Sequence, residues 1–238
     1  MRFLSIRTRR ILPPQDDIYT VLDKFLPRLR EGDIVFITSK ILAIHQGRCV
    51  KIEKGTRKSE LIRREAERLF PFRTLHSDFV PTIKGSTLIP SAGIDESNGN
   101  GYYILWPKDA SGSAKKICMY LKKKSRLRKL AVVITDSHTM PLRNGVIGIS
   151  IGFFGLEPVR DRRGSPDVFG RKLQHTRVNV VDALSAAAVF YMGETDERTP
   201  IVILRGEKNM RFTNTPTWKK ITIPSKMDLY YPLLKVLR

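Results

Sequence analysis

Apolar and polar positions follow helical spacing in some segments of the chain and strand-like runs in others. Between Asp16 and Arg30 apolar side chains recur every three or four residues, which predicts a helix with one face formed by Ile18, Val21, Leu22, Phe25, Leu26 and Leu29. After the turn at Gly32-Asp33, the mostly β-branched run from Ile34 to Ile44 predicts a buried strand. Leu130 to Thr135 and Pro200 to Leu204 are continuous apolar runs that predict two further buried strands.

The rest of the pattern adds helices and strands in mixed order. Ser59 is a candidate N-cap for a helix that runs to Phe70 and ends before Pro71, and Ser113 is a candidate N-cap for a basic helix. The buried side of that basic helix would consist of Ala114, Ile117 and Leu121. Further predicted elements are strands over 101–106 and 145–155 and an alanine-rich helix over 180–192. With no internal repeat or low-complexity linker, the chain is predicted to be α+β (mixed α/β), in a single unit over 1–238 with room for two interwoven subdomains.

Composition excludes several classes of protein. The 238 residues are 41% apolar with only 14 Pro and 16 Gly, so a disordered or fibrous chain is excluded. Two cysteines, Cys49 and Cys118, provide neither a disulfide framework nor a thiolate zinc site. No apolar run approaches the roughly 20 residues of a spanning helix. Since arginines interrupt the first 14 residues, no signal peptide is expected there, and we expect a cytoplasmic protein.

The net charge of +20 favours an anionic partner, and its distribution is uneven. No acidic residue lies between Asp109 and Asp136, a stretch that holds Lys115, Lys116, Lys122, Lys123, Lys124, Arg126, Arg128 and Lys129. A solvated helix face, a nucleic-acid surface and a field for a polyanionic substrate are all consistent with this run. No zinc finger, basic zipper or aromatic ribonucleoprotein signature supports the nucleic-acid interpretation. Charge alone leaves these alternatives open.

The common catalytic signatures are absent. There is no GxxxxGK[ST] phosphate loop, no GxGxxG before a helix and no HExxH, and the four histidines lack metal-ligand spacing. The glycines at 145, 148, 152 and 155 lie in a strand-like pattern, so we interpret them as bulges or points of close backbone approach.

Carboxylates follow the ends of several predicted elements. Asp95 ends an apolar run and is flanked by hydroxyl and amide side chains, Asp136-Ser137 follows the strand that ends at Thr135, and Glu194 follows the alanine-rich helix. Oxygen ligands of this kind suit Mg²⁺ or Mn²⁺. For each carboxylate taken singly, a turn or cap residue is the favoured interpretation. Three of them in one basic chain place a site for a metal and phosphate groups on an equal footing with it.

These segments belong to an ordered series of motifs that spans almost the whole chain. The series consists of Gly32 to Val35, Thr38 to Lys40, Gly47-Arg48, Ser91 to Asn98, Asp109 to Ala114, Thr135 to Ser137, Arg143 to Val146, Asp161 to Gly164, Asp167 to Arg171, Asp182 to Leu184 and Met192 to Glu194. In this series the chain resembles the coenzyme F-420:L-glutamate ligases, which are gamma-glutamyl ligases. It is most similar to the branch named for folate metabolism.

The resemblance implies a mixed α+β fold with mixed sheets, an intertwined homodimer, and a ligase that uses GTP (or ATP) and one or two Mg²⁺ or Mn²⁺ ions. The metal ligands that it implies are Asp95, Asp136, Ser137 and Glu194. The nucleotide contacts that it implies are Leu12, Pro13, Ser39, Lys40, Asn98, Met192, Gly193 and Thr195. The substrates would be L-glutamate and a carboxylate acceptor of the folate or deazaflavin (coenzyme F-420) type.

The chain departs from the family pattern at two places. A family lysine that touches the nucleotide is replaced by Ile44, and Lys40 is the candidate to supply the missing charge. The residues from His138 to Arg143 resemble the folate-named branch, which affects the choice of acceptor more than the chemistry.

The expected reaction activates the acceptor carboxylate as an acyl phosphate, which the amine of glutamate then attacks. Candidates to grip glutamate or the acceptor carboxylate are Arg143, Arg163 and Arg171, because arginine binds carboxylates bidentately. The alternative hypothesis is a non-catalytic basic protein that retains the fold and binds RNA or another polyanion. Membranes are not expected partners, and nucleic acid is not favoured.

Overall fold

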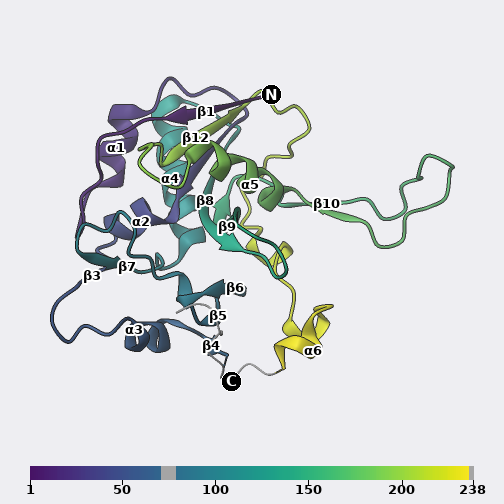
Figure 1. Cartoon of the computed structure of the whole chain (residues 1–238). Helices are drawn as coiled ribbons and strands as arrows, with labels where there is room; N and C mark the ends of the chain where they lie inside the picture. The colour runs from purple at the N-terminus through teal and green to yellow at the C-terminus, as the bar shows by residue number, and fades with distance from the viewer. Residues whose placement is uncertain (71–78, 236–238) are drawn as a thin grey trace.

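A five-stranded mixed sheet forms the centre of the protein (Figure 1). The computed structural model describes residues 1–70 and 79–235. The strand order is β1 (Arg2–Ile6), β12 (Ile201–Arg205), β2 (Asp33–Thr38), β8 (Leu130–Thr139) and β9 (Val146–Phe154). β2 and β8 are parallel, and the other neighbouring pairs of this sheet are antiparallel. The predicted α+β class with mixed sheets is confirmed.

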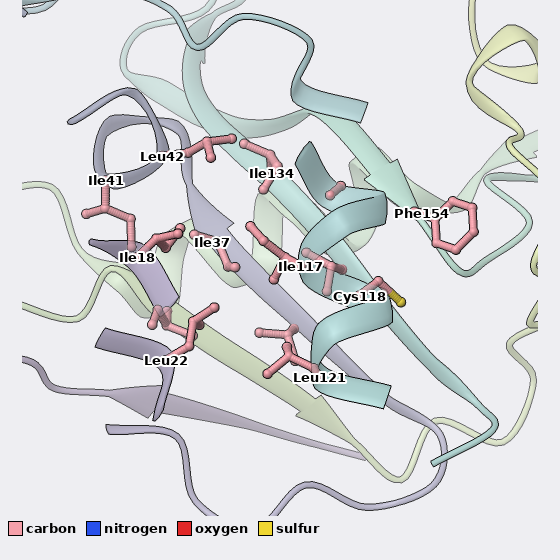
Figure 2. Close-up of a cluster of buried hydrophobic side chains, with 14 of the residues drawn as sticks. Ile18, Leu22, Ile37, Ile41, Leu42, Ile117, Cys118, Leu121, Ile134 and Phe154 are labelled. Atoms are coloured by element: carbon pink, nitrogen blue, oxygen red, sulfur yellow. The ribbon is translucent and has the colours of Figure 1, made fainter. Parts of the chain in front are cut away.

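Alternate residues of the central strands contact two different hydrophobic layers. On β2, Val35 and Ile37 belong to a cluster with helices α1 (Ile18–Phe25) and α4 (Ala110–Ser125). Figure 2 shows side chains of α1 and α4 turned toward the strands in this layer. The neighbours Ile34 and Phe36 pack on the opposite face, against helix α5 (Val180–Met192). This alternation follows from the period of two in a strand and buries the sheet on both faces.

Polar side chains cap the helices α1, α4 and α5. Asp17 accepts from the backbone N–H groups of α1, Asp109 accepts from Gly112 in α4, and Asn179 accepts from Asp182 in α5. Each cap satisfies a backbone donor that the first turn of a helix leaves unpaired.

Smaller elements surround the sheet. The two-stranded sheets are β3 (Cys49–Lys51) with β7 (Tyr102–Ile104), and β10 (Val159–Asp161) with β11 (Arg177–Asn179). A three-stranded sheet holds β4 (Arg68–Leu69), β5 (Pro81–Lys84) and β6 (Thr87–Pro90). The short helices are α2 (Ser39–His45), α3 (Lys58–Glu65), η1 (Ser91–Gly93), η2 (Trp218–Lys220), η3 (Ser225–Met227) and α6 (Tyr231–Leu234). No helix among the described residues has both the length and the apolar character needed to cross a membrane.

The strand predicted over 34–44 is wrong in its second half. The chain leaves the sheet at Thr38, and residues 39–45 form α2, whose Ile41, Leu42 and Ile44 are buried. A short apolar run is compatible with either a buried strand or a buried helix, so its periodicity could not separate the two.

Two predicted helices have different ends in the structure. The helix expected to run from Ser59 to Phe70 ends at Glu65, because Arg68–Leu69 instead pairs with β5. Pro71, which was predicted to end this helix, lies outside the described residues. The basic helix begins at Ala110, three residues before the predicted cap Ser113, because Asp109 is the side chain that caps it.

Asp136 and Ser137 lie within a strand rather than after one. β8 continues to Thr139 because β9 pairs with it as far as Thr139 and Val146, past a register shift at Ile134/Thr135. The glycines of β9 allow close approach, as predicted: a Cβ on Gly148 would lie 2.4 Å from the Ser185 carbonyl oxygen, and one on Gly152 would lie 2.5 Å from the Ala110 carbonyl carbon.

Candidate active site

A pocket of about 780 Å³ opens where five segments of the chain meet. Its walls come from residues 7–12, the β2–α2 junction, the loop 95–100, the far half of β8, and residues 189–200 at the end of α5. These segments are far apart in the sequence, and the order of strands in the central sheet brings them together.

Five acidic residues line the pocket. The three that the sequence predicted, Asp95, Asp136 and Glu194, come from three of these segments, and Asp196 and Glu197 follow Glu194. Asp95 follows η1, and two backbone hydrogen bonds with Ile104 hold it. The Asp95 N–H donates to the Ile104 carbonyl oxygen at 3.0 Å, and the Ile104 N–H donates to the Asp95 carbonyl oxygen at 2.8 Å. Asp136 is on β8, and Glu194 follows the C-terminus of α5. The family motifs predicted these residues as metal ligands together with Ser137, which also lines the pocket.

Asp95 is paired with a cation inside the pocket. Lys40 Nζ lies 2.6 Å from Asp95 Oδ2 and 2.8 Å from the Ser97 carbonyl oxygen. Ser97 also donates to Asp95, through its backbone N–H at 2.8 Å and its hydroxyl at 2.9 Å. Burial opposes ionisation of this carboxyl, but Lys40 and Ser97 outweigh it, so the pKa of Asp95 is lowered from its usual value.

The pKa values of Asp136 and Glu194 are raised, whereas that of Asp95 is lowered. Burial raises the pKa of Asp136 to about 6, even though Trp106 Nε1, the Ser137 N–H and the Ser39 hydroxyl donate to it. Burial also raises the pKa of Glu194; Lys40 opposes the rise, and the nearby charge of Asp95 adds to it. Neither Asp136 nor Glu194 makes an ion pair with a described residue, so a bound cation would stabilise their ionised forms.

The donor set fits a divalent cation. Carboxylates and a hydroxyl are the oxygen ligands that Mg²⁺ and Mn²⁺ prefer. Burial raises the pKa values of two of these carboxyls, Asp136 and Glu194, and a cation bound between them would favour their ionised forms. Within residues 1–70 and 79–235, no three acidic, histidine or cysteine side chains form a preassembled cage. A cation here would therefore need ligands from outside this set, such as the phosphate oxygens and waters that commonly complete magnesium sites.

The structure brings most of the predicted nucleotide contacts to this pocket. Those that line it are Leu12, Lys40, Asn98, Met192, Gly193 and Thr195. Asn98 also links two walls, because its side-chain amide donates to the Thr195 carbonyl oxygen at 3.0 Å. Pro13 and Ser39 are buried and are not among the lining residues; the Ser39 hydroxyl donates to Asp136 instead. The replacing residue Ile44 does line the pocket and is 2% exposed.

An arginine-rich rim was missed by the sequence reasoning. Arg7, Arg9, Arg10 and Arg198 all line the pocket. Arg9 is held by Asp16 through two hydrogen bonds of 2.5 Å and 2.6 Å, whereas the other three make no ion pair with any described residue. The run of arginines in the first ten residues was the sequence signal for this rim, although by itself it does not indicate which pocket the arginines line.

The three candidate arginines for substrate binding lie outside this pocket. Arg143 is exposed in the turn between β8 and β9. Arg163 and Arg171 lie on a long hairpin, residues 159–179, which extends from the body of the protein and which we call the arm (Figure 1). Arg163 pairs there with its neighbour Asp161 at 2.5 Å. The structure thus separates these three arginines from the carboxylates of the same chain.

Comparison with known proteins identifies the family. Residues 5–206 match the model of the family described as F420-0:Gamma-glutamyl ligase. The chain is 33% identical over 219 residues to the coenzyme F420:L-glutamate ligase of Methanothermobacter thermautotrophicus, covering 85% of this chain and 86% of the relative. It is 33% identical over 231 residues to the enzyme of the same name from Methanopyrus kandleri, covering 87% and 88%. The predicted resemblance and the ligase class are confirmed, and the chain belongs to the F420-0:Gamma-glutamyl ligase family.

Proposed function

We propose that the protein is a nucleotide-dependent gamma-glutamyl ligase that joins L-glutamate to a carboxylate of a coenzyme F-420-type or folate-type acceptor, with GTP as the expected nucleotide. The observation that carries the proposal is the convergence of Asp95, Asp136 and Glu194 in one pocket, although 99 residues separate the first from the last. The family membership and the names of the relatives, which are coenzyme F420:L-glutamate ligases, support the same reaction class.

The proposed chemistry has two steps. An acceptor carboxylate oxygen attacks the terminal phosphorus of the nucleotide, which forms an acyl phosphate and releases the nucleoside diphosphate. The free amine of glutamate then attacks the acyl carbon, the amide bond forms, and inorganic phosphate leaves as the amine loses a proton. Because such transfers depend on positioning and charge stabilisation, the protein needs fixed cations and ligands around the phosphates.

Asp95, Asp136, Ser137 and Glu194 would hold one or two Mg²⁺ or Mn²⁺ ions. When bound, such an ion neutralises phosphate charge and polarises the phosphoryl oxygens. Lys40 and the rim arginines Arg10 and Arg198 line the same pocket and provide further cations for the nucleotide phosphates. Leu12 and Ile44 provide apolar wall area suited to the base.

We also propose that the functional unit is a homodimer in which the arm of each subunit contacts the other subunit. Val168 and Phe169 on the arm are 91% and 94% exposed, which is unusual for large apolar side chains in a monomer. Arg163 and Arg171 lie on the same arm, away from the pocket of their own chain. A second copy of the chain would both cover the apolar residues and place these arginines beside a neighbouring pocket.

Thermal unfolding with GTP or ATP, each with and without Mn²⁺ or Mg²⁺, tests the site. A ligand at about 100 times its dissociation constant stabilises the folded state by roughly 2.7 kcal/mol, which is readily measured. A shift that requires both nucleotide and metal supports the ligase, and phosphate release with glutamate then identifies the acceptor among folates and deazaflavins. A salt-dependent interaction with RNA without any nucleotide shift would instead favour the non-catalytic binding protein.

Mixing of two variant subunits tests whether the arm of one subunit acts on the pocket of the other. In a hybrid of Asp136→Asn and Arg171→Ala subunits, one pocket is intact and faces an intact arm. If the arm acts on the neighbouring pocket, the mixture recovers activity that neither parent has. If Arg171→Ala alone is fully active, or if the protein is monomeric at working concentration, the proposed role of the arm is wrong.

A further inference from the structure

The indole of Trp106 lies directly behind the carboxylate pocket. Its Nε1–H donates to Asp136 Oδ2, while the Ser137 N–H donates to Asp136 Oδ1 at 2.9 Å. Each oxygen of this carboxylate thus has a fixed protein donor on one side. Trp106 is 5% exposed, so its ring cannot turn away without disturbing its surroundings.

The backbone around Trp106 is fixed by three further contacts. Ile104 exchanges two backbone hydrogen bonds with Asp95, and the Leu105 N–H donates to the Arg48 carbonyl oxygen at 2.9 Å. Arg48 Nε donates to the Trp106 carbonyl oxygen at 3.1 Å, and Glu65 holds the same guanidinium at 2.5 Å. Residues 104–106 therefore contact two of the predicted metal ligands, the backbone of Asp95 through Ile104 and the carboxylate of Asp136 through the indole.

Gly93 has a specific role in this arrangement. A Cβ at Gly93 would lie 2.3 Å from both Cδ1 and Nε1 of the Trp106 indole, and the residue has a φ of +71°, which favours glycine. The buried turn from Ser91 to Gly93 is held by the Ala92 N–H, which donates to Thr82 Oγ1 at 2.8 Å. Glycine at position 93 leaves the edge of the indole free to reach Asp136.

We infer that Trp106 is a positioning residue of the cation site: its indole N–H fixes the Asp136 carboxylate, while the same three-residue segment fixes Asp95 through Ile104. The inference rests on the proposed function, because it assigns Trp106 to the site where a divalent cation would bind. A partner that orients a metal ligand in this way commonly contributes about 10- to 100-fold to metal affinity.

The experiment measures Mn²⁺ affinity in the presence of GTP by electron paramagnetic resonance of free Mn²⁺. The variant is Trp106→Phe, and the matched control is Trp218→Phe, which removes the only other tryptophan, a residue that packs on Phe153. We expect the dissociation constant of Mn²⁺ to rise roughly 10-fold or more in Trp106→Phe and to stay unchanged in Trp218→Phe. In activity assays the KM for Mn²⁺ should rise while kcat at saturating Mn²⁺ changes little.

A second measurement removes the N–H donor without changing the size of the ring. In Trp218→Phe protein, Trp106 is the only tryptophan, so replacing tryptophan with benzothienylalanine exchanges only this indole N–H for sulfur. The same loss of Mn²⁺ affinity is expected. In unsubstituted Trp218→Phe protein, paramagnetic Mn²⁺ should quench Trp106 emission saturably, and Mg²⁺ should relieve the quenching.

Gly93→Ala should reproduce the loss of Mn²⁺ affinity, with little further loss when it is combined with Trp106→Phe. Unchanged Mn²⁺ affinity in folded Trp106→Phe or in the benzothienyl protein would overturn the inference and leave the proposed function intact. If the wild-type protein does not bind Mn²⁺ with either nucleotide, the proposed function fails and the inference fails with it.

Discussion

Two aspartates on neighbouring parallel strands of the central sheet have opposite environments. Asp33, at the start of β2, is fully buried and paired with Arg205, through Nε at 2.9 Å and Nη2 at 2.7 Å, and with the Arg30 N–H at 2.9 Å. Asp136, on β8, makes no ion pair with a described residue and lines the pocket.

The difference separates a structural carboxylate from a candidate functional one. The charge of Asp33 is neutralised within the fold, so it needs nothing from outside. Asp136 has hydrogen-bond donors but no cation, and burial raises its pKa to about 6. The residue type is the same in both places, so the surroundings decide which carboxylate is available to a ligand.

Neutralising each aspartate separately should have different consequences for stability and for nucleotide binding. Asp136→Asn should abolish Mn²⁺-dependent nucleotide binding and lower ligase activity by roughly 100-fold or more, because a metal contact is worth several kcal/mol. Its unfolding free energy should be unchanged or higher, since an uncompensated buried charge is removed. Asp33→Asn should instead cost about 3 to 5 kcal/mol of stability, as expected for a broken buried pair.

Urea unfolding and nucleotide titration on both variants check this prediction. The comparison would be wrong if Asp33→Asn were as stable as the wild type, or if Asp136→Asn destabilised the fold as strongly as Asp33→Asn does.

The second test uses pH. Because the folded-state pKa of Asp136 is raised from 3.8 to about 6, its protonated form stabilises the fold at low pH, and this contribution is lost as the pH rises through 6. The difference in unfolding free energy between wild type and Asp136→Asn should fall by roughly 2 kcal/mol between pH 4 and pH 7 in metal-free buffer. A difference independent of pH would contradict the assigned environment.

The third test concerns Lys40, the cation closest to the site. Lys40→Met should weaken nucleotide affinity roughly tenfold, a typical loss for one charge-assisted hydrogen bond, and the pKa of Asp95 should rise toward its usual value. Lys51→Met is the matched control, because Lys51 is 3.0 Å from Glu53 in an exposed pair and is not among the residues that line the pocket. Equal nucleotide affinities in the two variants would rule out a role for Lys40.

The amphipathic patterns predicted much of the fold. The alanine-rich helix over 180–192 has the predicted ends, and the buried strand that begins at Leu130 lies between β2 and β9 in the central sheet. The run over 34–44 was misassigned because all its apolar residues are buried, whether they belong to β2 or to α2. Hydrophobic periodicity does not distinguish a strand from a helix where all faces of the element are buried.

The site was predictable only in part. Asp95, Asp136 and Glu194 were identified from an ordered series of motifs, and the structure places all three in one pocket. Trp106 could not be identified in this way, because a tryptophan at the end of an apolar strand is usually a core residue. Only its N–H contact with Asp136 distinguishes it. The rim arginines could not be identified from the sequence either, because the pairing of β1 with β12 is what brings residue 7 and residue 198 to the same pocket.

The most direct test of the central claim is thermal unfolding of wild-type and Asp136→Asn protein with GTP, with Mn²⁺, and with both. Cation-dependent nucleotide binding at the three carboxylates predicts a large upward shift in Tm for the wild type with both ligands, and no such shift for the variant. A shift of equal size in Asp136→Asn would place the nucleotide site elsewhere. The absence of any shift in the wild type with GTP or ATP would contradict the proposed ligase site.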